Sequence, residues 1–110
     1  MIARMWRGRT RAEKSADYLE YLERTGLSDC RATEGNRGVQ ILLRTEGDVA
    51  EFLFFSFWED LDAIRGFAGP DLEKAVYYPE DEAFLLEKEP TVVHYEVAAG
   101  GPDPSLRNDG

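Results

Sequence analysis

The sequence has few of the residues that metal and disulfide sites need. One cysteine, Cys30, and one histidine, His94, occur among its 110 residues. A single cysteine cannot close an internal disulfide, and a zinc site of cysteine and histidine needs more ligands than these. The acidic run Glu80, Asp81 and Glu82 lacks the spacing of a calcium loop and fits the solvated start of a helix. We therefore expect no metal site.

Long apolar runs and an excess of positive charge are also missing. No apolar run approaches the ~20 residues that cross a membrane. The N-terminal stretch "MIARMWRGRT" has arginines but not the apolar centre of a signal peptide. The net charge of −9 argues against nucleic acid as a partner. These features predict a cytoplasmic protein with no membrane or nucleic-acid partner.

The positive charge that is present gathers in the first part of the chain. Residues 1–44 hold nine Lys or Arg and six Asp or Glu, whereas residues 45–110 hold four and sixteen. Alternating arginines at positions 4, 7, 9 and 11 fit either an anion-attracting surface or a solvated edge strand. Edge strands commonly carry charge, so the second interpretation is favoured.

The first half of the chain predicts a strand followed by a helix. Apolar residues among arginines indicate a strand in "IARMWRGR". Thr10 and Glu13 have the spacing of a capping box, and Gly26 fits the position just after a helix that ends near Arg24. The predicted buried stripe of this helix consists of Ala12, Ala16, Leu19 and Leu22, with Tyr18 beside it.

The second half predicts two strands, short helices and a last strand. "GVQILLRTEGDVAEFLFFSFW" indicates an antiparallel hairpin with its turn at residues 46–48. Asp60 is a predicted N-cap of a helix, and Pro70 is a predicted start of a second short helix. A further helical turn follows in residues 80–89, then the strand "TVVHYEV". Residues 99–110 are rich in glycine, proline and polar residues, which predicts a disordered tail after a domain of residues 1–98.

This order predicts an α+β fold, a ferredoxin-like βαββαβ motif with an antiparallel sheet and helices on one face. The stretch "FLFFSFW" within residues 49–60 is apolar on both faces of its strand, because side chains alternate along a strand. Helices cover one face only, and a large apolar face is rare on a monomer. We expect a homodimer through the sheet face, with the two sheets pairing into a dimeric α+β barrel.

The stretches "FSFWEDLDAIRGFAG", "AVYYPEDEAFL" and "VVHYEV" resemble the antibiotic biosynthesis monooxygenase family of the dimeric α+β barrel superfamily. The resemblance covers about residues 1–98. It implies a homodimer with a cavity between the sheet and the helices of each subunit. Known activities in the family include cofactor-free oxygenation of aromatic polyketides and oxidative haem degradation, and other members have no assigned reaction.

The resemblance does not extend to the haem-degrading members. Those proteins use an Asn on the first strand, a Trp in the second helical region and a His shortly after it. Here the first strand has no Asn, the Trp position holds Phe67, and the His position falls near Tyr77. We therefore expect no haem and no other cofactor.

Two residues are candidates for catalysis and three for ligand contact. His94 titrates near neutrality and could deprotonate an electron-rich substrate, with Tyr77 as the other candidate. Because side chains alternate along a strand, His94 lies on the face opposite Val93, Tyr95 and Val97. Those three residues are favoured for burial, so we expect His94 to be partly exposed or at the barrel interface. Three aromatic residues fit either a pocket for a planar ligand or core packing: Trp58, Phe67 and Tyr78.

Two functions agree with these observations. One is a cofactor-independent monooxygenase that acts on a small aromatic or polycyclic substrate. The other is a non-catalytic dimeric module that binds a small apolar or aromatic ligand or serves a stress-related role. The sequence leaves both open, and it predicts the ligand site between Trp58 and Phe67 on one side and Tyr77 and Tyr78 on the other.

Overall fold

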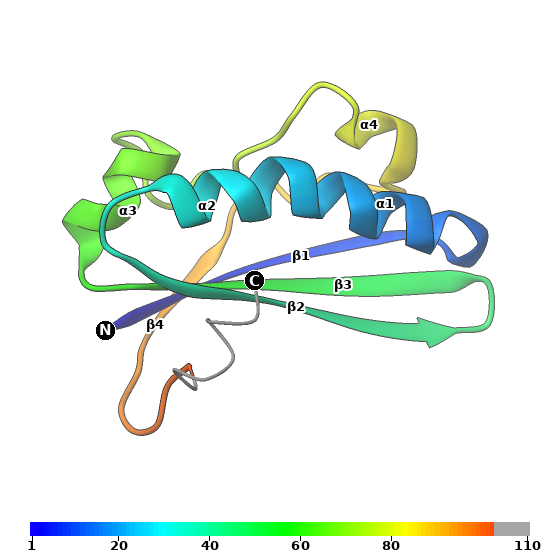
Figure 1. The fold of residues 1–110 in the computed structure, drawn as a ribbon. Coiled ribbons are helices and arrows are strands. Elements are labelled where there is room, and N and C mark those ends of the chain that lie inside the picture. Colours follow the sequence, from blue (N-terminus) through cyan, green and yellow to red (C-terminus); the bar gives the residue numbers. More distant parts are fainter. Residues whose placement is uncertain (103–110) are drawn as a thin grey trace.

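A computed structural model of the chain describes residues 1–102. Its four strands form one antiparallel sheet in the order β2-β3-β1-β4, and the described helices lie over one face of it (Figure 1). The strands are β1 (Ile2–Arg11), β2 (Asn36–Glu46), β3 (Val49–Trp58) and β4 (Val93–Glu96). The α-helices are α1 (Ser15–Leu22), α2 (Ser28–Ala32), α3 (Leu61–Ala68) and α4 (Asp81–Phe84). This is the predicted α+β, ferredoxin-like fold.

The helix after β1 is longer than predicted. A π-helical stretch, Glu23–Leu27, joins α1 directly to α2, so Gly26 lies inside the helix and is buried. A Cβ at Gly26 would lie 3.5 Å from the Phe54 ring, which shows how closely the helix backbone approaches the sheet. The predicted helix end at Gly26 is therefore wrong. No helix within residues 1–102 is long and apolar enough to cross a bilayer.

The start of that helix also differs from the prediction. Thr10 belongs to β1, where it pairs with Ala50, and its buried hydroxyl donates to the carbonyl of Arg11. A 3-10 turn, Ala12–Lys14, begins without a side-chain cap. The capping box fails because strand pairing continues through Thr10 and leaves its side chain in the core. The buried face of α1 consists of Tyr18, Tyr21 and Leu22, whereas Ala16 of the predicted stripe is exposed.

The two faces of β3 have different surroundings. Ala50, Phe52, Phe54, Ser56 and Trp58 are buried and face the helices, as the alternating burial of the strand shows. The residues between them face the other side of the sheet, where no helix of residues 1–102 lies (Figure 1). The hairpin turn is as predicted, because Glu46 pairs with Val49 across Gly47, which has a φ of 59°.

We call the uncovered side of the sheet the open face. Strand register places one apolar group on it: Met5, Leu42, Leu53, Phe55, Phe57, Val93 and Tyr95. Leu42 is 48% exposed and Tyr95 is 52% exposed, and the rings of Phe55 and Phe57 stack with centroids 6.4 Å apart. The expected burial of Val93 and Tyr95 is wrong, because the helices cover the opposite face of β4.

The segment between α3 and β4 contains less helix than predicted. Asp60 caps α3 as expected, since its carboxylate accepts from the backbone N–H of Ala63. No helix begins at Pro70. Residues 73–75 instead run alongside residues 90–92, with Ala75 N–H donating to the carbonyl of Pro90. Helix α4 supplies the predicted later turn, and most of the predicted tail, residues 103–110, lies outside the described residues.

Candidate functional site

A cavity lies between the helix-covered face of the sheet and the helical layer. Its floor comes from β1 and β3, its side from α1 and the π-helical stretch, and its roof from residues 76–81. The empty space between these side chains, mouth included, is about 480 Å³, but only about 50 Å³ is wide enough for the centre of a water molecule. The cavity is therefore a narrow slot, which suits a flat ligand and requires its walls to move for a larger one.

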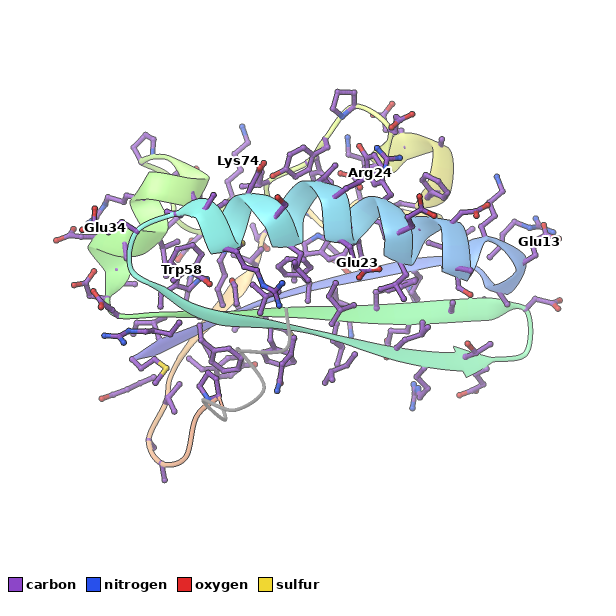
Figure 2. All side chains as sticks on the ribbon, viewed as in Figure 1. Glu13, Glu23, Arg24, Glu34, Trp58 and Lys74 are labelled. Carbon is purple, nitrogen blue, oxygen red and sulfur yellow. The ribbon has the colours of Figure 1, made fainter. Side chains whose placement is uncertain are left out.

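The predicted ligand-contact residues divide into two groups. Phe67 and Tyr78 line the cavity, and so does Tyr77. Trp58 does not line it, although it contacts two wall residues: its ring stacks on Phe67 with centroids 5.9 Å apart, and its Nε1 donates to Ser56 Oγ at 2.8 Å. Figure 2 shows Trp58 pointing from the sheet toward the helical layer. Trp58 thus holds the wall in place, and the contact of any of these residues with a ligand stays a prediction.

The Tyr77 hydroxyl is fully engaged with protein groups. It accepts a hydrogen bond from Trp6 Nε1 at 3.1 Å and donates its own proton to the carbonyl of Glu89 at 2.5 Å. Burial raises the pKa of Tyr77, so the phenol is neutral near pH 7. In this arrangement Tyr77 shapes the slot and offers no base to it.

His94 lies on the helix side of β4, opposite Arg4 of β1. Its Nε2 is 3.1 Å from Nη1 of Arg4. An arginine can only donate, so Nε2 is the acceptor and the ring proton sits on Nδ1. Burial, and secondarily the charge of Arg4, lower the pKa of His94, which keeps the ring neutral near pH 7. His94 is half-buried but does not line the cavity, so it acts on the site through Arg4.

Arg4 is a wall residue that the sequence analysis placed on a solvated edge strand. Strand β1 is not an edge where Arg4 lies, because Ile2–Met5 pair with both β3 and β4. Arg4 is only 4% exposed and donates to the carbonyls of Leu72, at 2.6 Å, and Lys74, at 3.0 Å. The alternation along the strand was a signal for this burial, because Arg4 lies on the same face of β1 as the apolar residues Ile2 and Trp6.

The other arginines of β1 differ from Arg4 in their surroundings. The face of β1 opposite Arg4 carries Arg7, Arg9 and Arg11. Each of these forms a solvent-exposed ion pair with a glutamate. Such exposed pairs contribute little to stability. These three side chains agree with the predicted solvated arginines, and Arg4 does not.

Asp81 is a second wall residue that sequence analysis did not single out. It is 3% exposed at the start of α4, whereas the neighbouring Glu80 and Glu82 are exposed as expected. Its Oδ1 accepts from the Tyr18 hydroxyl at 2.9 Å, and its Oδ2 accepts from the backbone N–H of Tyr78 at 2.6 Å. Burial and the adjacent Asp81 carboxylate raise the pKa of Tyr18. No residue pattern in the acidic run marked its middle member as the buried one.

Within residues 1–102 no three His, Cys, Asp or Glu side chains stand close enough to hold a metal ion. The expectation of no metal and no cofactor stays a prediction. The cavity offers instead a guanidinium, a carboxylate and aromatic walls. This set can bind a flat molecule, orient it through polar contacts and stabilise a charge on it.

Solved structures of other proteins share this fold. One is a protein from Bacillus cereus proposed to be an antibiotic biosynthesis monooxygenase, with a TM-score of 0.63 and 15% sequence identity over 94% of this chain and 96% of that one. Another is an uncharacterized NIPSNAP domain protein from Burkholderia xenovorans, with a TM-score of 0.60 and 22% identity over 94% of this chain and 100% of that one. No family model matches the sequence, and neither does any curated protein. These similarities support the fold that the resemblance implied, and they leave the reaction open.

Proposed function

We propose that this chain is an antibiotic-monooxygenase-like domain that forms a homodimer through the open face and binds a small aromatic molecule in the cavity of each subunit. The observation that carries the proposal is the slot itself. Trp6 and Tyr77 meet edge to face with ring centroids 6.1 Å apart, and Phe67 and Tyr78 complete the aromatic walls. Two buried polar side chains, Arg4 and Asp81, reach the same space. Few, well-placed polar groups within apolar walls are typical of small-molecule sites.

Binding without catalysis is the function that this geometry supports better. A cofactor-independent oxygenase needs a base that faces its substrate. The Tyr77 proton is donated to a backbone carbonyl, and His94 accepts from Arg4 outside the cavity. Neither of the two predicted catalytic residues therefore presents a free base to the slot.

A cofactor-independent monooxygenase is the second candidate, and Asp81 favours it. In such a reaction a carboxylate removes a proton from an electron-rich carbon acid, and the resulting anion reacts with dioxygen. One oxygen atom replaces the two hydrogens of a methylene as a carbonyl, and the other leaves with those hydrogens as water. Asp81 is a carboxylate on the cavity wall, and Arg4 supplies a cation that would stabilise the intermediate anion.

The homodimer is proposed because the open face needs a cover. Its apolar side chains include Phe55, Phe57 and Tyr95, from both the centre and the edge of the sheet. A second copy presents the same face, so two sheets pack with apolar groups on both sides. We assign residues 1–98 to this domain and the protein to the cytoplasm, where the unpaired Cys30 thiol suits a reducing environment.

Chemical-shift mapping with a library of small aromatic fragments tests the ligand site. We expect the amide signals of Gly26, Phe67 and Tyr77 to shift together, because all three residues line the slot. In the Gly26→Leu variant the new side chain would fill the slot, so the same fragments should lose their effect. Shifts that cluster on the acidic stretch of Glu59, Asp60 and Asp62 and leave the slot unchanged would contradict the proposal.

Oxygen uptake separates the two functions. Fragments that bind and carry an acidic methylene or phenol are incubated with the protein in an oxygen electrode cell. Uptake that the Asp81→Asn variant loses while it still binds the fragment would establish the monooxygenase. Binding without uptake across these fragments supports the non-catalytic function.

A further inference from the structure

Arg4 carries a positive charge on the cavity wall that no described acidic group neutralises. None of the ion pairs formed by residues 1–102 involves Arg4. The three groups that accept from its guanidinium are two backbone carbonyls and the imidazole of His94. The nearby Cys30 does not supply a thiolate, because burial raises the pKa of its thiol to about 12. A buried charge of this kind is usually paired with an opposite charge.

The guanidinium also has hydrogen-bond donors to spare. Three of the five N–H groups of an arginine are used in the contacts to Leu72, Lys74 and His94. The remaining two, one on Nε and one on Nη2, form no hydrogen bond to an acceptor of residues 1–102. Arg4 lines the cavity at 4% exposure, so an acceptor for these groups would come from the contents of the cavity.

Asp81 does not serve as the missing partner, although it lines the same cavity. Its two oxygens accept from Tyr18 and from the backbone of Tyr78, and it forms no ion pair with Arg4. The cation is fixed to the sheet floor through β1, and the carboxylate is fixed to α4 and α1. The cavity therefore has one charged group of each sign, each held by its own neutral partners.

We propose that the ligand of this cavity is an aromatic acid, bound as its anion by the free N–H groups of Arg4. This inference rests on the proposed small-molecule site and specifies the chemical class of its ligand. A planar carboxylate matches the fork of a guanidinium, and such charge-assisted bonds are stronger than bonds between neutral groups. His94 is a positioning residue, because it holds Nη1 and leaves the other edge of the guanidinium to the ligand.

The negative net charge of the protein restricts where a preference for acids can come from. A net charge of −9 repels anions at long range, so a preference for acids cannot come from general attraction. It has to arise from a local group, and salt screens the long-range repulsion more than the buried contact. A ligand preference for acids would therefore identify Arg4 as its cause.

Matched acid and amide probes test the inference on the full chain. Benzoate is compared with benzamide, and 2-naphthoate with 2-naphthamide, by titrations at neutral pH and constant ionic strength. Each pair has nearly the same size and shape, so the ratio of the two dissociation constants reports the exchange of an anionic carboxylate for a neutral carboxamide. We expect each acid to bind about tenfold more tightly than its amide, and to shift the Arg4 Nε–H signal when it binds.

Two variants locate the source of the preference. Arg4→Met should lose the preference and bind the acid no more tightly than the amide, whereas Arg4→Lys should keep part of the preference. If Arg4→Met does not fold, the ratio of the acid and amide dissociation constants of the wild type, together with the shift of the Arg4 Nε–H signal, still tests the inference. Equal binding of acid and amide to the wild type overturns the inference and leaves the aromatic site standing. Failure of all four probes, while other fragments occupy the slot, also overturns it, and failure of every fragment removes the proposed function as well.

Discussion

Nη1 of Arg4 lies 3.1 Å from Nε2 of His94, across the neighbouring strands β1 and β4. The contact joins the single histidine of the chain to a buried cation on the cavity wall. It fixes the histidine tautomer and one side of the guanidinium at once. A proton on Nε2 would place two positive charges at hydrogen-bond distance, so protonation of His94 and the position of Arg4 are coupled.

The first prediction is that His94 titrates below its ordinary pKa of 6.5, because burial and Arg4 both oppose its charged form, with Glu73 acting the other way. The unfolded chain binds this proton near pH 6.5, and the folded chain binds it only at lower pH. Protons therefore favour unfolding, and this contribution to stability is present above pH 6.5 and is lost as the pH falls below it. The histidine Cε1–H signal gives the midpoint directly.

His94→Gln is the control for that titration. Its urea midpoint should fall less steeply than that of the wild type between pH 7 and the folded-state pKa, because glutamine does not titrate. Carboxylates contribute equally to both proteins, so the difference isolates His94. A histidine midpoint at or above 6.5 would show that the contact with Arg4 is absent in solution.

The second prediction concerns the open face. The wild type should have twice the 12.5 kDa chain mass by light scattering, and Phe55→Asp should give a folded monomer. Phe55 lies on the open face, so the new carboxylate would be desolvated in the dimer at a cost of several kcal/mol and solvated in the monomer. Phe54→Asp should instead prevent folding, because Phe54 is 8% exposed and faces the helices.

Leu61→Asp is the matched control for the dimer. Leu61 is an exposed apolar residue at the first position of α3, away from the open face, and a carboxylate is favourable there. This variant should remain a dimer. A wild-type monomer at micromolar concentration would exclude the sheet-face dimer.

The sequence predicts the order of strands and helices well because each element has a local signal. Apolar residues repeat about every 3.6 residues in a helix and every second residue in a strand, which separates the two kinds of element. The turn at Gly47 sets the hairpin register, in which Glu46 pairs with Val49. The face of β3 is harder to predict, because the buried set includes Ala50 and Ser56 whereas the open set includes Phe55 and Phe57. A helix packed close to the sheet favours small residues beneath it, and the open face also carries Glu51, so the composition of the two faces does not tell the core side from the open side.

The site is harder to predict than the fold because its polar members depend on distant contacts. Arg4 bonds to Leu72, 68 positions along the chain, and Asp81 to Tyr18, 63 positions back. Local patterns cannot indicate such partners, so the sequence alone predicts that Arg4 and the acidic run are solvated. The aromatic wall residues Phe67, Tyr77 and Tyr78 were accessible to sequence analysis, because glycine and proline between them break the helical layer.

The third prediction is that Asp81→Asn destabilises the protein by about 1–3 kcal/mol. The amide keeps one acceptor for either Tyr18 or the Tyr78 backbone, and its NH₂ group then faces the donor that remains. Urea unfolding measures the loss. Glu82→Gln in the same helix is the control, and because its ion pair with Lys88 is exposed it should change stability by less than about 1 kcal/mol. Equal effects of the two substitutions would show that Asp81 is solvated, like its neighbour.

The last prediction is that Gly26→Ala stabilises the protein by about 0.5–1 kcal/mol, because alanine has the higher helix propensity and restricts the unfolded chain. The added Cβ would meet the Phe54 ring at 3.5 Å and the Tyr78 ring at 4.0 Å, which are ordinary contact distances. Gly47→Ala is the control, and we expect the opposite effect. Gly47 has a φ of 59°, a backbone conformation that is strained for alanine, although no atom lies within 4 Å of the added Cβ. This substitution should destabilise the protein by about 1 kcal/mol. Thermal unfolding of both variants measures whether each substitution raises or lowers the unfolding temperature.

Because the new methyl group also narrows the slot, Gly26→Ala should weaken the binding of aromatic fragments while Gly47→Ala leaves it unchanged. A Gly26→Ala variant that is less stable than the wild type would show that the helix needs glycine here for its backbone and not for the space beside Phe54.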